Sequence, residues 1–194
     1  MQMNDDRERF WKLLQPEYSG ALGFSRKLAG DPDRGDDLFQ DALVTAFTAF
    51  ESLRRADSFK PWLYRIIVNT FRSQVRRPWW KRLVPMTPET ELSLVADDPL
   101  EAHTARRWLQ KAFQAISVED QALVTLHELE GWPVEELART FSRTEGAVKA
   151  KLFRARRKMK KALLQMSSAA DTARSEETRS KKDKAWIAAK PGTD

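Results

Sequence analysis

The sequence predicts an all-α protein made of two small helical domains that a flexible linker joins. The chain has 194 residues, 32% of them charged, and only seven glycines. It is rich in Ala, Leu, Arg, Lys and Glu, which have high helix propensity. Apolar residues recur at helical spacing in two blocks, and this periodicity is lost between them, where prolines are frequent. The predicted units are a first domain at residues 1–78, a linker at 79–100, a second domain at 101–166 and a disordered tail at 167–194.

The first domain begins with two predicted helices. One spans about residues 10–28 and ends at the turn signal around Gly30. The second begins near Asp36, and its apolar side carries Phe39, Leu43, Ala46 and Phe50. An acidic group of side chains lies away from that side: Asp36, Asp37, Gln40 and Asp41. Such a face is either ordinary solvated surface or a patch that docks a protein, and the residues alone leave both readings open.

The third predicted helix combines cations with aromatic rings. Ser58 can cap its start, Pro61 fits its first turn, and it runs to about Arg77. One face carries Arg65, Asn69, Arg72 and Arg76, and the rings of Phe59, Trp62, Tyr64 and Phe71 interleave with these residues. Arginines beside aromatic faces can neutralise phosphates while the rings hold unstacked bases. Single-stranded DNA is therefore a candidate ligand, although Trp62 and Phe71 are equally compatible with a place in the core.

The second domain is predicted to begin with two helices. The first has apolar positions from Ala102 to Ile116, and Ser117 caps the next one, which ends at Gly131. The tail after residue 166 has almost no large apolar side chains, so burial cannot offset the entropy lost on ordering it. We expect this tail to be disordered.

Residues 134–161 have the pattern of a helix-turn-helix: a helix, a three-residue turn and a second helix. The small Ala138 suits the close crossing of two helices, and Thr144 can cap the second one. That second helix presents an outward side with Lys149, Phe153, Arg156 and Lys160. Residues near its start could reach base edges in the major groove, while later arginines could neutralise phosphates.

The charge on this helix favours DNA binding over an ordinary solvated surface. Between residues 143 and 161 there are nine basic side chains, and the only acid is Glu145. A formal net charge of +6 for the whole chain is compatible with a polyanionic partner but would not identify one. The crowding of cations on one short element is the more specific signal.

Composition argues against several other classes of protein. The chain has no cysteine, which excludes disulfides and thiolate metal sites. It has two histidines, His103 and His127, and neither a glycine-rich phosphate loop nor a His/Glu pair at metal spacing, so we expect no enzyme and no cofactor. No apolar run approaches the length of a membrane span, and the N-terminus lacks the apolar stretch of a secretory signal. We therefore expect a cytoplasmic protein.

Three sequence blocks together resemble one family. They are DDLFQD at residues 36–41, SFKPWLYRIIVN at 58–69 and EGAVKAKLFRAR at 145–156. In this order they resemble the extracytoplasmic-function sigma factors of bacterial RNA polymerase, over about residues 10–164. The resemblance implies that the first domain is sigma region two and the second is sigma region four. It implies an alternative sigma factor that brings core polymerase to promoters and assists their opening without hydrolysing a nucleotide.

The resemblance also implies roles for individual residues. The second helix docks on the coiled coil of the polymerase beta-prime subunit through Asp36, Asp37, Gln40, Asp41 and Val44. The loop and helix that follow capture a flipped base and the backbone of the single-stranded minus-ten element through Leu53, Arg54, Arg55, Ser58, Phe59, Trp62, Arg65, Asn69, Arg72, Arg76 and Arg77. The second helix of the helix-turn-helix reads the double-stranded minus-thirty-five element through Thr144, Glu145, Lys149, Ala150, Phe153, Arg154, Arg156 and Arg157. Region four also contacts the beta flap, and an anti-sigma factor is a candidate partner.

Some positions depart from the family pattern. Ser142 stands at a turn position where the family commonly has glycine, and Ala147 and Ala150 replace hydroxyl side chains. The missing hydroxyls remove expected phosphate or base contacts, so no promoter consensus is transferred to this chain. A stand-alone helix-turn-helix regulator is the alternative function, and it would bind duplex DNA without polymerase.

Overall fold

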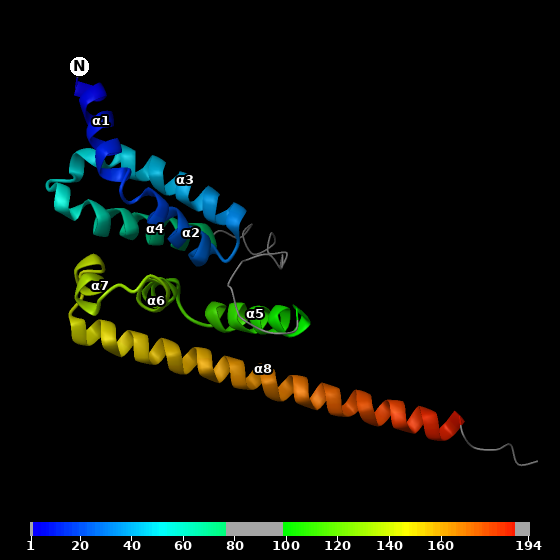
Figure 1. Ribbon diagram of the computed structural model, residues 1–194. Helices are drawn as coiled ribbons and strands as arrows, with labels where there is room; N and C mark the ends of the chain where they lie inside the picture. Colours follow the sequence, from blue (N-terminus) through cyan, green and yellow to red (C-terminus); the bar gives the residue numbers. More distant parts are fainter. Residues whose placement is uncertain (1, 77–98, 189–194) are drawn as a thin grey trace, which may run out of the picture.

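The computed structural model describes residues 2–76 and 99–188, and all regular structure in these two ranges is helical. Figure 1 shows the helices in two layers, with α1 to α4 in one and α5 to α8 in the other. The expected all-α fold is therefore confirmed. The predicted linker at residues 79–100 lies outside the described residues, except for its last two positions, which begin α5.

The first domain consists of four α-helices and two short 3-10 turns. Their bounds are α1 Gln2–Leu14, α2 Tyr18–Ala29, α3 Pro32–Thr48, η1 Phe50–Ser52, η2 Ala56–Ser58 and α4 Phe59–Arg76. The single helix predicted for residues 10–28 is wrong, because the chain turns between α1 and α2 at Pro16. Proline lacks the backbone donor of a helix interior and disfavours helical geometry in the residue before it, which explains the break.

The turn between α2 and α3 brings these helices close together. Gly30 ends α2 with φ at 73°, and the Asp31 side chain accepts a hydrogen bond of 2.9 Å from the Arg34 amide at the start of α3. The helix starts at Pro32, earlier than the predicted start near Asp36, because Asp31 caps it and a proline is tolerated in the first helical turn. The Arg26 side chain bridges the two helices by binding Asp36 at 2.6 Å.

The second domain consists of α5 Pro99–Gln114, α6 Val118–Val124, the π-helical turn η3 Thr125–Leu129, α7 Val134–Thr140 and α8 Glu145–Ala188. Ser117 caps α6 as predicted, because its Oγ accepts a hydrogen bond of 3.2 Å from the Asp120 amide. The chain leaves η3 at Gly131, whose φ of 70° is in the left-handed region. Glycine adopts that conformation without the steric cost of a side chain.

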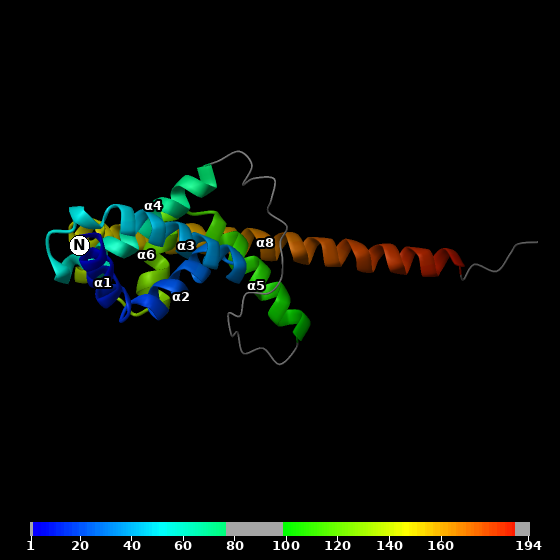
Figure 2. The same ribbon diagram turned by 90° about the horizontal axis from the view of Figure 1, so that it is seen from above.

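The last helix differs from the expected disordered tail. In the structure α8 continues without interruption through residues 167–188 and projects beyond both domains, as Figures 1 and 2 show. The sequence there is rich in Ala, Lys, Arg and Glu, which have high helix propensity, and a helix that is already formed extends at little cost. Residues 189–194 lie outside the described range.

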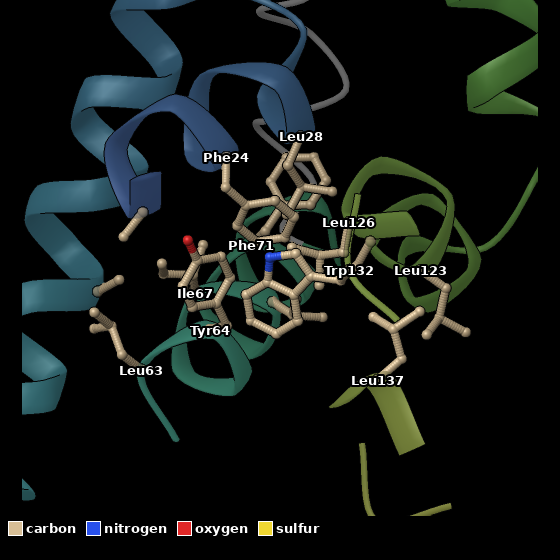
Figure 3. Packing of buried hydrophobic residues seen from close by; sticks show 14 of the residues in the cluster. Phe24, Leu28, Leu63, Tyr64, Ile67, Phe71, Leu123, Leu126, Trp132 and Leu137 are labelled. Atoms are coloured by element: carbon tan, nitrogen blue, oxygen red, sulfur yellow. The ribbon is translucent and has the colours of Figure 1, made fainter. Parts of the chain in front are cut away.

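The two domains share one hydrophobic core. Buried residues of both domains form a single cluster, and α4 contacts α6 and α7 directly. Figure 3 shows Trp132 of the second domain beside Tyr64 of α4, with Leu123, Leu126 and Leu137 on its other side. Tyr64 and Trp132 are 2% and 6% exposed. The domains are thus packed against each other, a relationship that the sequence did not reveal.

Candidate functional site

The outward face of α3 is acidic at one end and apolar at the other. Asp37 and Gln40 are exposed, and Val44 exposes 68% of its surface. Phe47 follows on the next turn and is 42% exposed although its ring packs edge-on against Phe10 at 5.4 Å. Val44 and Phe47 together leave an apolar patch beside the carboxylates, and an exposed apolar patch rimmed by polar residues can dock another protein.

Two carboxylates of this acidic group already have intramolecular partners. The Asp36 carboxylate binds Arg26, and the hydrogen bond from Arg26 holds the pKa of Asp36 below its usual value. Asp41 Oδ2 accepts a hydrogen bond of 2.9 Å from Gln74 Nε2 of α4. Asp36 and Asp41 therefore contribute to the packing of α3, whereas Asp37 and Val44 project from it.

The cationic face of α4 is turned partly toward the second domain. Asn69 and Arg76 are exposed, and Arg77 lies outside the described residues. Arg65 Nη1 donates to Ser142 Oγ at 3.4 Å, and Arg72 lies 3.9 Å from Glu119. The predicted cationic face exists, but two of its members contact the second domain.

The aromatic residues of α4 divide between core and surface. Phe59 is 2% exposed and its ring lies 5.7 Å from Phe10, while Phe71 is 6% exposed. Trp62 is half-buried, with its ring 5.8 Å from that of Phe59. The structure therefore places Phe59 in the core, where it cannot contact DNA directly, and leaves Trp62 partly exposed.

The loop before α4 borders a cavity of about 650 Å³. Leu53 is only 7% exposed and supports the loop from inside, so a direct DNA contact by its side chain is not available in this conformation. Arg54 and Arg55 are exposed, and Arg55 pairs with Asp57 at 2.6 Å. The wall of the cavity includes Ser58, Trp62 and Arg65 of the first domain and Glu136, Arg139 and Thr140 of α7. Its volume is in the range of small-ligand pockets.

The second domain contains the predicted helix-turn-helix. Helix α7 is followed by a turn and then by α8, and Ala138 is buried where the helices meet. Thr144 caps α8, because its Oγ1 accepts a hydrogen bond of 3.2 Å from the Ala147 amide. Ser142 has φ of 51°, a left-handed conformation that costs free energy for any residue with a Cβ.

The first turns of α8 present an exposed surface of cations around one aromatic ring. Phe153 is 59% exposed, and the guanidinium of Arg157 lies 5.8 Å from its ring centre. Lys149 and Arg154 are exposed, while Ala150 is half-buried. Glu145 pairs with Lys149 at 3.4 Å, and Arg156 Nε donates to Glu128 of η3 at 2.9 Å. The predicted residues are thus together on one side, and Arg156 is partly used to hold α8 on η3.

Two carboxylates on α6, those of Glu119 and Asp120, bind cations of the helix-turn-helix and hold it against α6. Arg143 Nε donates to Glu119 Oε1 at 2.7 Å, and Lys151 Nζ binds Asp120 Oδ1 at 3.1 Å. Burial alone would raise the pKa of Glu119, but the hydrogen bond from Arg143 and the charge of Lys151 outweigh it, so the pKa is lowered. For Asp120 burial is likewise outweighed by hydrogen bonds from Ser117 and Lys151, and its pKa is lowered. These ion pairs were not predictable from the sequence, because the partners are far apart in the chain.

The described part of the chain offers neither a metal site nor a membrane-spanning helix. Within residues 2–76 and 99–188, no cluster of histidine, aspartate and glutamate side chains could hold a metal ion. No helix in the same ranges is both long and apolar enough to cross a lipid bilayer.

The comparisons with known proteins agree with this arrangement. The family model for sigma-70 region 2 matches residues 13–81, and the model for sigma-70 region 4 matches residues 106–159. The ECF RNA polymerase sigma factor SigM of Mycobacterium tuberculosis is 28% identical over 158 residues, which cover 81% of this chain and 79% of that protein. The RNA polymerase sigma-E factor of Streptomyces avermitilis is 28% identical over 159 residues, covering 79% of this chain and 84% of the relative. This chain is an extracytoplasmic-function sigma factor.

Two solved structures have the same fold. The sigma factor RpoE of Bartonella quintana, solved in complex with the anti-sigma factor NepR, is 24% identical with a TM-score of 0.55, covering 79% of this sigma factor and 96% of that chain. CnrH, solved in complex with the cytosolic domain of CnrY, is 21% identical with a TM-score of 0.54. The match covers 81% of this chain and 88% of that chain. The sigma factor described here is an alternative sigma factor that directs RNA polymerase, and the alternative of a stand-alone regulator is not favoured.

Sequence reasoning missed one prominent residue of this sigma factor. Trp132 follows Gly131 in the connection between η3 and α7 and carries the largest ring of the interdomain contact. A tryptophan beside a turn glycine is a weak signal in a single sequence. Its partner Tyr64 was recognised only as one of several rings on α4.

Proposed function

We propose that this sigma factor performs its task with three surfaces of different chemistry. The outward face of α3 docks on the beta-prime coiled coil of core polymerase. The α4 helix and its preceding loop hold the single-stranded minus-ten element, and the start of α8 reads the double-stranded minus-thirty-five element. The observation that carries the proposal is the separation of these surfaces, with exposed Asp37 and Val44 on α3 and exposed Lys149, Phe153 and Arg154 on α8.

The docking surface on α3 combines negative charge with apolar area, and binding needs both. Asp37 supplies a carboxylate for a basic partner, which speeds and orients association, while Val44 supplies apolar area that loses water on binding. Gln40 lies between them and can donate and accept hydrogen bonds. Asp36 and Asp41 act indirectly here, because their bonds to Arg26 and Gln74 fix the helix that carries the contact residues.

The minus-ten surface combines positive charge with a cavity at the loop. Arg54, Arg65 and Arg76 can neutralise phosphates of the displaced strand, and the partly exposed ring of Trp62 can stack on a base. Extruding a base costs a few kcal/mol, which contacts in a pocket and with arginines can offset. Strand opening then requires no nucleotide hydrolysis by this chain, and we propose that it is not an enzyme and needs no cofactor.

The minus-thirty-five surface separates base reading from backbone contacts. Lys149, Phe153 and Arg154 lie on the first turns of α8 and can enter the major groove, where lysine and arginine recognise guanine edges and an apolar ring contacts a thymine methyl. Arg157 lies one turn later and can neutralise a phosphate. Thr144 caps the helix and Glu145 positions Lys149, so both contribute mainly by shaping the surface.

The partners proposed for this chain are core polymerase, through the beta-prime coiled coil and the beta flap, and promoter DNA in double-stranded and single-stranded form. We propose that a protein that binds core polymerase and promoter DNA acts in the cytoplasm. Two of the structures with the same fold are complexes, one with an anti-sigma factor and one with a cytosolic domain. These complexes support an anti-sigma factor as a further partner.

Run-off transcription with purified core polymerase tests the proposal. Asp37→Arg and Val44→Asp should each abolish most sigma-dependent transcript by weakening docking. Glu8→Arg makes the same charge change at an exposed position of α1 and should leave transcription unchanged. Lys149→Ala combined with Arg154→Ala should reduce the transcript from promoters and leave binding to core polymerase intact. Transcription that survives both sets of changes would contradict the assignment of these surfaces.

A further inference from the structure

A cavity of about 490 Å³ lies between α2, α5, η3 and α8. Its walls are mostly apolar, with Leu109 and Phe113 of α5, Leu129 of η3 and Met159 of α8. Helices α5 and α8 contact each other on this side of the second domain, as Figure 1 shows. The volume lies within the range of pockets that hold small molecules. None of the residues proposed above to contact polymerase or DNA lines this cavity.

The end of α2 supplies one wall of the cavity. Lys27 and Gly30 lie there, and a Cβ atom added at Gly30 would be 3.5 Å from Gln110 Nε2 of α5. One turn of an α-helix with its side chains is about 5.4 Å long and roughly 10 Å wide. A space of this volume between four elements holds about one such turn, so it suits a small molecule better than a helix of another protein.

The interior of the cavity contains a hydrogen-bonding group that no described residue satisfies. Thr125 of η3 lines the cavity and is 0% exposed, and its Oγ1 has no hydrogen-bond partner within the described part of the chain. A buried hydroxyl without a partner costs free energy. Thr125 also begins the π-helical turn η3, and such turns are frequent at functional sites. A ligand with a polar atom at this depth would supply the missing partner.

The mouth of the cavity is positively charged. Lys160 of α8 lines it and is exposed, and no carboxylate pairs with Lys160 among the described residues. Two other cations of the wall are already paired, because Arg156 binds Glu128 and Lys27 binds Glu130 at 2.6 Å. One uncompensated ammonium group beside apolar walls attracts a ligand with a single negative charge.

We propose that this cavity binds a small amphiphilic carboxylate. Its acid group pairs with Lys160, its apolar body lies among Leu109, Leu129 and Met159, and a polar atom at its other end reaches Thr125. Nucleotides and polyphosphates fit less well, since their several negative charges require more than one unpaired cation. The inference rests on the cavity alone and is independent of the function proposed above.

Isothermal titration calorimetry of the full chain with decanoate tests the site. Decylamine, which is protonated at neutral pH, is the matched ligand because it has the same apolar chain and the opposite charge. Decanoate should bind saturably at one site and at least roughly tenfold more tightly than decylamine, because reversing the charge of the ligand replaces attraction to Lys160 by repulsion. Equal affinities for the two ligands would overturn the proposal.

Lys160→Glu tests the charge at the mouth. This variant should lose the preference for decanoate over decylamine. Lys158→Glu makes the same charge change at an exposed position of α8 that does not line the cavity, and it should keep the preference. Circular dichroism should show the same helix content in both variants. A preference that Lys160→Glu leaves unchanged would contradict the pairing of the acid group with Lys160.

Thr125→Val tests the interior of the cavity, because it keeps the shape of the side chain and removes the hydroxyl. The wild type should bind decanoate that carries a hydroxyl at the far end of its chain roughly threefold to tenfold more tightly than decanoate itself, the range for one added hydrogen bond. The variant should bind both acids equally. No gain in the wild type, or the same gain in the variant, would refute the placement of the polar end at Thr125.

Methyl nuclear magnetic resonance of the full chain locates the bound ligand. Signals of Leu129 and Met159 should shift saturably with decanoate, whereas Leu164, which is 61% exposed on α8 and does not line the cavity, should not respond. Shifts centred on another surface, or the absence of saturable binding, would overturn the proposal. A groove that serves only an apolar segment of a protein partner would give no preference for the acid over the amine and would also overturn it.

Discussion

Gly35 of α3 lies directly against the backbone of Arg26 in α2. A Cβ atom at residue 35 would be 2.3 Å from Arg26 Cα, whereas nothing lies within 4 Å of a Cβ at Gly23. The absence of a side chain at Gly35 therefore sets the spacing of the two helices and, with it, the orientation of the α3 face that we assign to polymerase docking.

Gly35→Ala should destabilise the protein because the added methyl group overlaps the backbone of Arg26. We expect a loss of roughly 1–3 kcal/mol in the free energy of unfolding. Gly23→Ala is the matched control in α2 and should stabilise the protein by roughly 0.5–1 kcal/mol, the usual difference between glycine and alanine in a helix. Chemical denaturation measures both. Equal stability of the two variants would show that α2 and α3 are not in such close contact.

Ser142→Gly should stabilise the second domain. Its φ of 51° is left-handed, and glycine adopts that conformation without the penalty of a Cβ. We expect a gain of about 0.5–1 kcal/mol, reduced by loss of the hydrogen bond from Arg65. Ser142→Ala removes the same hydroxyl but keeps the Cβ, so it should be less stable than the glycine variant. The reverse order in thermal unfolding would contradict this account of the turn.

The ion pairs of Glu119 on α6 predict a stability that depends on pH. The pKa of Glu119 is lowered in the folded state, so its contribution is present above its usual pKa and is lost as pH falls through the lowered value. Glu119→Gln should therefore cost roughly 1–2 kcal/mol at pH 7 and much less below about pH 4.

Thermal unfolding of wild type and Glu119→Gln between pH 7 and pH 3 measures this difference. Glu135→Gln is the control, because Glu135 is 70% exposed and lies 3.9 Å from Arg139 in the same domain. Its stability should match wild type at every pH. A Glu119→Gln penalty that stays constant down to pH 3 would exclude ionisation of this carboxylate as its source.

Phe153→Ala should weaken recognition of the minus-thirty-five element without affecting folding. The ring is 59% exposed, so its removal leaves no cavity, and loss of one base contact corresponds to about 1–3 kcal/mol of binding. Leu164→Ala changes another residue of α8 that is 61% exposed and should bind promoter DNA normally. Fluorescence anisotropy with duplex promoter DNA and polymerase holoenzyme gives both affinities. Similar losses for the two variants would argue against Phe153 as a specific contact.

Local patterns predicted much of this structure. The helix-turn-helix, the Ser117 and Thr144 caps and the exposure of Phe153 follow from spacing within a few residues, and all are present. The resemblance of three short blocks was sufficient to identify the family. The break at Pro16 was not predicted, although a proline disfavours the interior of a helix.

Contacts between distant residues were not predictable in this way. Phe59 and Trp62 look alike on α4, yet Phe59 is buried among Phe10 and Phe50 because α1 and η1 cover that side. The partnership of Tyr64 with Trp132 depends on how two domains pack, and no local pattern specifies it. The same holds for the ion pair between Glu119 and Arg143, which joins α6 to the turn before α8.

The most direct test of the central claim is equilibrium binding of the full chain to core RNA polymerase. The labelled wild-type protein should bind core polymerase saturably in an anisotropy titration, and Asp37→Arg should weaken that binding by at least roughly tenfold, as expected when a charge that meets an opposite charge on the partner is reversed. Glu8→Arg should bind like wild type. A folded wild-type chain that does not bind, or one whose affinity is the same with Asp37→Arg and Val44→Asp, would contradict the account.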